Sequence, residues 1–94
     1  MIDRAMLASD LEALLLGALP EGAFRRKYDP LVAASPLLDS IWGNLQHYLD
    51  DSDIRARDIS YRELQEGELR KLIALLRGDA PMAALAHITF LSLT

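Results

Sequence analysis

The chain of 94 residues contains no cysteine, no leader-like segment and no long apolar run. Without cysteine it cannot form disulfides, zinc-thiolate sites or a cysteine nucleophile, and a reducing compartment fits best. Asp3, Arg4 and Asp10 interrupt the first ten residues, so they do not have the pattern of a signal peptide. The longest apolar stretches, residues 13–19 and 80–93, are shorter than the ~20 residues that span a bilayer. We therefore expect a cytoplasmic protein with no membrane partner.

Positive charge and aromatic side chains are also scarce. Ten lysine and arginine residues stand against fourteen aspartate and glutamate residues, a net charge of -4 with neutral histidines. Nucleic-acid binding needs a basic face that contacts phosphates, so this balance argues against it and favours a cationic protein partner. The basic cluster Arg25-Arg26-Lys27 is interpreted as a solvated helix face. The single tryptophan, Trp42, is of a residue type common in interfaces.

The hydrophobic residues, 51% of the chain, recur with helical spacing. A chain of this length encloses one core, so residues 1–94 are expected to form a single helical domain. Between Asp3 and Leu19 the apolar residues recur at steps of three and four, which predicts a first helix with one buried stripe. Ser9 and Glu12 match a capping box and offer a later start, but the stripe already begins before them. The stripe consists of Met6, Leu7, Leu11, Leu14, Leu15 and Leu19.

Prolines divide the next part of the chain into helices. A proline cannot continue the first helix but can open a second, which we expect over residues 20–28. Asp29-Pro30 and Ser35-Pro36 each combine a capping side chain with a proline suited to the first helical turn. The first pair predicts only a turn over residues 31–34, and the second predicts a helix over residues 36–49. The expected buried face of that helix combines Leu38, Ile41, Leu45, Tyr48 and Leu49, flanked by Leu37 and Trp42.

Clustered carboxylates follow this helix. Asp50-Asp51-Ser52-Asp53 is predicted to be a loop, because carboxylates at a helix C-terminus repel each other and the negative end of the helix dipole. A last long helix is expected to begin with Ser60 as its N-cap. Glu63 would complete the capping box, with Ile59 and Leu64 as the hydrophobic staple. The buried stripe of this helix is expected to contain Leu64, Leu69, Leu72, Ile73 and Leu76.

The final segment is less regular. Arg77 suits a last helical turn, Gly78 the C′ position, and Pro81 enforces the stop. Residues 81–86 favour a short helix, whereas residues 88–91 have a strand-like composition with no partner strand. The whole pattern predicts an all-α fold: a small antiparallel four-helix bundle with short helical turns and a C-terminal tail.

Sites for metals, cofactors and catalysis each lack a required residue. In a calcium loop counted from Asp51, Ala56 stands where a glycine is needed and Arg62 where a bidentate glutamate is needed. His47 precedes a pair of aspartates at helical spacing, but an imidazole and a carboxylate are too few ligands for a metal. His87 is expected to be partly buried in the apolar tail. With no nucleophile elbow and no phosphate-binding loop, we expect no enzyme, no cofactor and no metal.

Several features together resemble one protein family. They are the leucine-rich first helix ending near Gly17, Phe24 and Tyr28 after it, the stretch 45–53, and Glu68-Leu69-Arg70 leading to Ile73. Over about residues 7–77 the chain resembles the bacterial colicin-like immunity proteins, the self-protective helical proteins of bacteriocin producers. The resemblance implies a non-enzymatic inhibitor that blocks a cognate toxin, commonly a basic nuclease domain, with acidic residues. The positions carried over are Asp50, Asp51, Asp53, Asp58, Glu63 and Glu66, and Trp42 is added as an interface anchor.

Other interpretations of these residues stay open. The acidic stretch could be no more than a solvated turn, in which Arg55 and Arg57 dilute the negative field. A second hypothesis is a structural or regulatory module that self-associates, as a homodimer, through its apolar tail and Trp42. A small nucleic-acid regulator is a third, but its basic surface is lacking.

Overall fold

The described part of the chain consists of helices and turns. The computed structural model describes residues 2–88, and within them there is no strand. The elements in order are α1 (Arg4–Leu15), α2 (Glu21–Tyr28), the 3-10 helix η1 (Asp29–Ala34), α3 (Pro36–Asp50), α4 (Ser52–Arg57), α5 (Ile59–Arg77) and α6 (Met82–Ala86). The predicted all-α fold is therefore confirmed.

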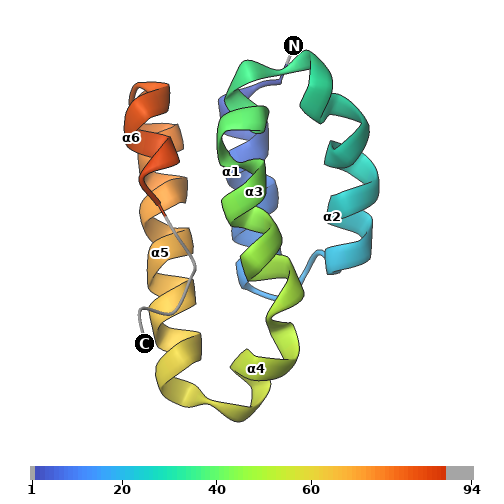
Figure 1. Ribbon diagram of the computed structural model, residues 1–94, viewed down its shortest axis with the longest axis vertical. Helices are drawn as coiled ribbons and strands as arrows, with labels where there is room; N and C mark the ends of the chain where they lie inside the picture. Colours follow the sequence, from blue (N-terminus) through green and yellow to red (C-terminus); the bar gives the residue numbers. More distant parts are fainter. Residues whose placement is uncertain (1, 89–94) are drawn as a thin grey trace.

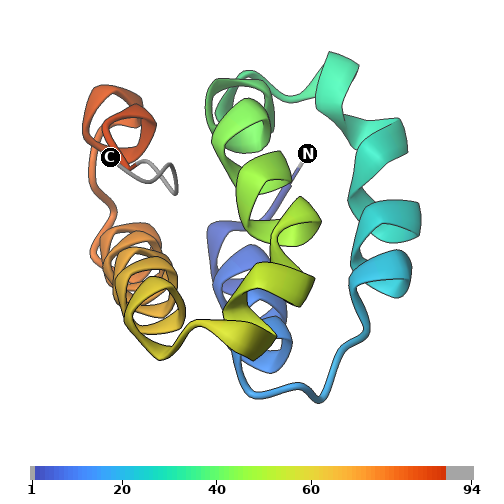
Figure 2. The same cartoon turned by 60° about the horizontal axis from the view of Figure 1, so that its bottom comes forward.

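The four longest of these α-helices alternate in direction along the chain. In Figure 1, α1 and α3 run downward, and α2 and α5 run upward. α3 lies in front of α1, with α5 and α2 on opposite flanks of this pair, as the turned view in Figure 2 also shows. α6 packs beside α3 and α5, and α4 closes the lower end between α3 and α5.

One hydrophobic core joins the helices. Each fully buried leucine, isoleucine or phenylalanine contributes about 1.5–3 kcal/mol relative to an exposed one. Met6 and Leu64, predicted to be buried, are instead exposed at the margins of their stripes. On α5 the polar Gln65 takes the buried position next to Leu64. The core includes Leu7, Leu11, Phe24, Tyr28, Leu38, Ile41, Leu45, Leu49, Leu69, Leu72, Leu76 and Leu85.

α1 has the early start predicted from its stripe, and the alternative start at Ser9 is wrong. The Asp3 carboxylate caps the helix by accepting the backbone N–H of Ala5 at 2.8 Å. The helix ends at Leu15 and not at Leu19, because Gly17 adopts a φ of +77° that breaks the helical path.

The proline pairs behave differently from each other. Ser35 caps α3 as predicted, its Oγ accepting the backbone N–H of Leu38 at 3.1 Å. Asp29 makes no capping hydrogen bond, and the chain passes directly from α2 into a 3-10 helix that is longer than the predicted turn. α3 extends one residue beyond its predicted end.

The predicted loop at residues 50–53 is wrong. α3 continues to Asp50, and α4 begins at Ser52. Partners distant in the sequence offset the expected carboxylate repulsion. Asp50 accepts a hydrogen bond from Arg25 at 2.6 Å, and Asp51 accepts one from the Tyr61 hydroxyl at 2.5 Å.

The start of α5 also differs from its prediction. Asp58, and not Ser60, is the N-cap, and its carboxylate accepts the backbone N–H of Tyr61 at 3.1 Å. Because α4 ends at Arg57, Asp58 is the residue left with extended backbone between the two helices. The predicted staple is absent: Ile59 is 64% exposed and Leu64 is exposed.

The C-terminal end of α5 differs in detail from its prediction. Gly78, predicted at the C′ position, has a φ of -86°, and the following residue, Asp79, adopts the positive φ instead.

The short helix after Pro81 is confirmed as α6. Leu85 and Ile88 are buried, and Asn44 on α3 donates a hydrogen bond to the carbonyl of Ile88 at 2.6 Å. His87 is exposed and not partly buried, because it lies between these two inward positions on a single turn. The rest of the strand-like segment, residues 89–91, lies outside the described residues. Over residues 2–88 no helix has the length and apolarity to cross a membrane.

Candidate protein-binding surface

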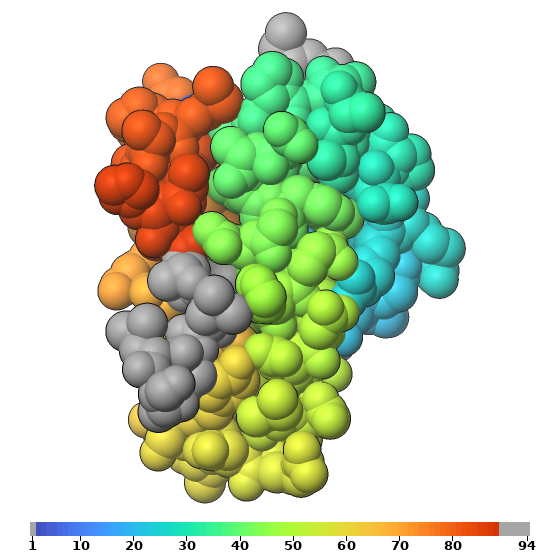
Figure 3. Space-filling view, in the orientation of Figure 1, coloured from blue at the N-terminus to red at the C-terminus, as the bar shows by residue number. Residues whose placement is uncertain are grey.

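The acidic residues gather at the end of the molecule where α3, α4 and α5 meet. We call residues 50–66 the acidic edge; it has six acidic and three basic residues, a net charge of -3. It lies at the lower end of Figure 1, and its surface is the yellow and yellow-green region at the bottom of Figure 3. Most of the net charge of the chain is therefore concentrated on one end of the bundle.

Arg55 holds α4 in place from inside this edge. The residue is 8% exposed. Its guanidinium donates to the backbone carbonyl of Tyr48 and to Oε1 of Gln65, the latter at 2.7 Å. It also lies 3.5 Å from the Glu21 carboxylate and 3.8 Å from the centre of the Tyr48 ring. Since a buried cation is stable only when it is paired, these contacts tie α4 to α2, α3 and α5.

Asp51 completes this network and faces the protein. Its carboxylate accepts hydrogen bonds from the Tyr61 hydroxyl and from Nε2 of Gln65, the latter at 3.0 Å. The bond to Asp51 raises the pKa of Tyr61 to about 12, so the phenol keeps its proton, and can donate it, further into alkaline pH than an ordinary tyrosine. Asp51 thus contributes to the structure of the edge more than to its outer surface.

Four of the predicted residues are exposed on the edge. Asp50 is paired with Arg25, and Asp53, 75% exposed, lies 3.8 Å from Arg57. Asp58 uses its carboxylate to cap α5 and remains exposed. Glu63 is exposed, with no ion pair within residues 2–88. Glu66, the last of the predicted acidic residues, is half-buried, and its carboxylate lies 3.8 Å from the guanidinium of Arg70.

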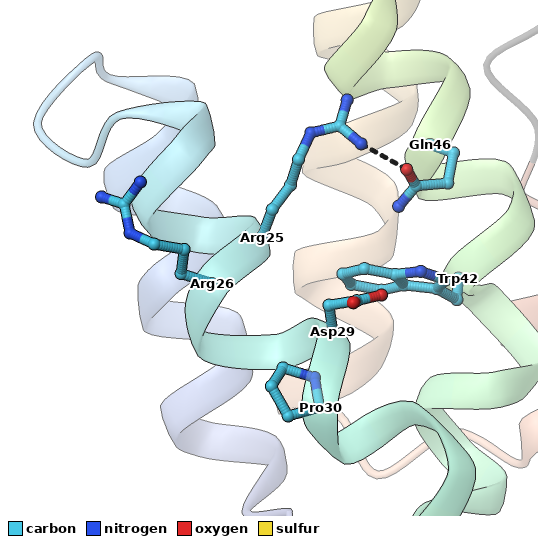
Figure 4. A pocket seen from close by; sticks show the side chains of 6 residues that line it. All are labelled: Arg25, Arg26, Asp29, Pro30, Trp42 and Gln46. Carbon is cyan, nitrogen blue, oxygen red and sulfur yellow. Dashed lines mark hydrogen bonds between the residues drawn. The ribbon is translucent and has the colours of Figure 1, made fainter.

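Trp42 lies outside the acidic edge, on the floor of a shallow groove between α2 and α3. The groove has a volume of about 440 Å³ and is shown in Figure 4. Trp42 is half-buried, and its ring stacks on Phe24 with centroids 6.2 Å apart. Arg26 points away from the indole. The full lining is Arg25, Arg26, Asp29, Pro30, Trp42 and Gln46.

Arg25 connects this groove to the acidic edge. Its guanidinium donates to Gln46, which lines the groove, and to Asp50, which begins the edge. Nε2 of Gln46 is buried without a hydrogen-bond partner among the described residues. The groove and the exposed acids are therefore neighbouring parts of one surface.

No family model matches this chain, and the curated proteins and solved structures compared with it contain no match either.

The histidines do not extend this surface into a metal site. His47 is exposed on α3, and the two aspartates that follow it are bonded to Arg25 and Tyr61. Across residues 2–88, no group of three histidine, cysteine or acidic side chains could hold a metal ion. Asp50, Asp53, Asp58 and Glu63 present their charge to the solvent.

The residues that build the edge carry no distinctive sequence pattern. Arg55 and Gln65 were not recognised as buried, because isolated arginine and glutamine side chains carry no signal of burial. Their positions offered one clue: Gln65 is four residues before Leu69 and lies on the same helical face as the buried stripe of α5.

Proposed function

We propose that this chain is a non-enzymatic immunity-type protein that binds and neutralises a cognate bacteriocin or toxin domain through its acidic edge. The observation that carries the proposal is the exposure of Asp50, Asp53, Asp58 and Glu63 around a helix that a buried arginine holds in place. The family resemblance of the sequence points to the same class of activity. The expected partner is a basic protein domain.

The rigidity of the edge supports a binding role. Ordering a flexible acidic loop on binding would cost about 0.5–1.5 kcal/mol for each immobilised side chain. Here the backbone between α3 and α5 is already helical, and Arg55 anchors it to three other helices. A preorganised field of one sign accelerates encounter with a partner of the opposite sign.

The Trp42 groove supplies the apolar part of this surface. Binding energy in protein interfaces is concentrated in a few tryptophan, tyrosine and arginine residues in desolvated pockets. Trp42 has an accessible face beside Pro30, and Arg25 links the groove to Asp50. We expect an apolar side chain of the partner to occupy the groove while basic side chains contact the edge.

Protection of cells is the direct test. The open reading frames on either side of the one for this chain would be expressed singly and together with it. We expect one neighbouring product to be lethal alone and harmless in the presence of this chain. If neither neighbour is lethal, or if a lethal neighbour is not neutralised, the proposal is wrong.

A charge variant tests the surface with that same toxin. Asp53→Asn with Glu63→Gln should slow association about three- to tenfold at low salt and flatten the salt dependence of the rate, because both side chains are exposed. Asp79→Asn is the control for charge removal outside the edge; it removes one charge whereas the edge variant removes two, so the effects are compared per charge removed. Asp79 is 93% exposed on the turn after α5, and asparagine accepts its positive φ. Equal effects of the edge and control variants would move the contact away from the acidic edge.

A further inference from the structure

A glycine lies in the middle of α3 although the fold does not need one there. Gly43 is exposed, and it has no positive φ, since Gly17 is the one glycine with a positive φ within residues 2–88. A Cβ atom added at Gly43 would meet no heavy atom of the described chain within 4 Å, apart from its chain neighbours and its own helix backbone. Alanine would fit the same position and stabilise the helix, because glycine loses more backbone entropy on folding.

Gly43 belongs to an exposed face of α3. Asp39 and His47 lie four residues before and after it, and Asp50 lies seven residues after it, so all of them share its side of the helix. These residues are exposed. α3 lies in front of α1, and its outer surface is part of the face seen in Figure 3. We call Asp39, Gly43, His47 and Asp50 the outer stripe of α3.

The outer stripe carries negative charge toward both ends. α3 contains no lysine or arginine, so Asp39 and Asp50 are not offset within the helix. Arg25 on α2 pairs with Asp50 at 2.6 Å, whereas Asp39 has no ion pair within the described residues. Asp50 is also the first residue of the acidic edge, so the stripe continues a surface with a net charge of -3. A basic segment of a partner therefore complements the stripe.

The Trp42 groove lies beside this stripe. Trp42 directly precedes Gly43, and Gln46, three residues after Gly43, also lines the groove. Of the other charged residues in the lining, Arg26 and Asp29 carry opposite signs. Because Gly43 has no side chain, a segment that places a side chain in the groove can pass close to the α3 backbone. A larger residue at this position would hold such a segment away.

We propose that a basic segment of the partner lies along the outer stripe of α3, with Gly43 at the point of closest approach. The inference rests on the proposed function, since the partner is the toxin domain that the chain neutralises. Glycine suits a place where another chain comes close to the backbone. Basic side chains of the segment would meet Asp39 and Asp50, and an apolar one would enter the Trp42 groove. Gly43 thus lowers the stability of the helix and improves binding.

Variants of increasing size at Gly43 test this proposal with the purified toxin that the protection assay identifies. Gly43→Ala should raise the midpoint temperature of thermal unfolding by about 2–6 °C, because alanine is the better helix former. The same variant should raise the dissociation constant of the toxin complex about threefold or more, and Gly43→Leu about thirtyfold or more, because the added atoms keep the partner from α3. Circular dichroism gives the midpoints, and titration calorimetry gives the dissociation constants.

Gly67 on α5 provides the matched controls, because a Cβ atom there also meets nothing within 4 Å among the described residues. Gly67→Ala should raise the midpoint temperature by a similar amount, and neither Gly67→Ala nor Gly67→Leu should change toxin binding. Binding that Gly43→Leu leaves unchanged, or equal losses in the two series, overturns this inference and leaves the proposed function intact. So does a lower midpoint for Gly43→Ala, which would show that the fold needs the glycine. If the unmodified chain neutralises no toxin, the proposed function and this inference fail together.

Discussion

At the scale of single residues, Asp10 shows how one carboxylate joins two helices. On α1 it accepts hydrogen bonds from Nζ of Lys27 at 2.7 Å and from the hydroxyl of Tyr28 at 2.5 Å, both on α2. Burial by itself would raise the pKa of Asp10, but the two hydrogen bonds and the Lys27 charge outweigh it, so the pKa is lowered. Burial and the bond to Asp10 raise the pKa of Tyr28. Asp10 is therefore held ionised and Tyr28 protonated, and these are the states in which the two side chains form their hydrogen bond.

Replacement of Asp10 should therefore weaken the fold in a pH-dependent way. Asp10→Asn is expected to lower the free energy of unfolding by about 1–2 kcal/mol at neutral pH, because the charge-assisted bonds are lost. A lowered folded-state pKa stabilises the fold above the ordinary value of 3.8, and the effect disappears as the pH falls through the folded-state pKa. The difference between the two proteins should thus shrink in acid.

Urea denaturation at neutral pH and at about pH 3 checks this dependence. Asp39→Asn serves as the control, because Asp39 is an exposed carboxylate on α3 and its loss should change stability by less than about 0.5 kcal/mol. If Asp10→Asn lowers the free energy of unfolding equally at both pH values, the pKa of Asp10 is not lowered in the folded state.

At the scale of elements, α4 is the helix that defines the candidate site. It has six residues, too few for a stable isolated helix, so its stability must come from tertiary contacts. Arg55 provides them through Tyr48, Gln65 and Glu21. Asp51, at the start of α4, is bonded to Tyr61 on α5.

Two arginines on α4 offer a matched comparison. Arg55→Met should destabilise the protein by about 2–4 kcal/mol, because Gln65 and Glu21 lose a buried partner. Arg57→Met should change stability by less than about 0.5 kcal/mol, because Arg57 is 75% exposed and its contact with Asp53 is long. Urea denaturation measures both changes. Similar losses in the two variants would mean that Arg55 does not anchor α4.

At the scale of the whole molecule, the negative charge is unevenly distributed. The acidic edge, residues 50–66, has a net charge of -3, whereas the whole chain carries -4. It lies at one end of the bundle, where α3, α4 and α5 meet. A partner of opposite charge is therefore expected to approach this end of the molecule.

The sequence by itself determined most of the helical framework. The spacing of apolar residues, the cap at Ser35 and the prolines predicted five of the helical segments to within a few residues, because these signals act over one or two turns. The concentration of acidic residues between α3 and α5 was also evident from the order of the residues.

Only the tertiary structure decided how that acidic stretch is arranged. The pairing of Asp50, the helix α4 and the inward position of Asp51 depend on Arg25, Tyr61, Gln65 and Glu21, which lie ten or more residues away from the residues they contact. Local patterns predict where a helix begins and which face is apolar. Burial of a charged side chain requires partners that the folded chain alone brings together.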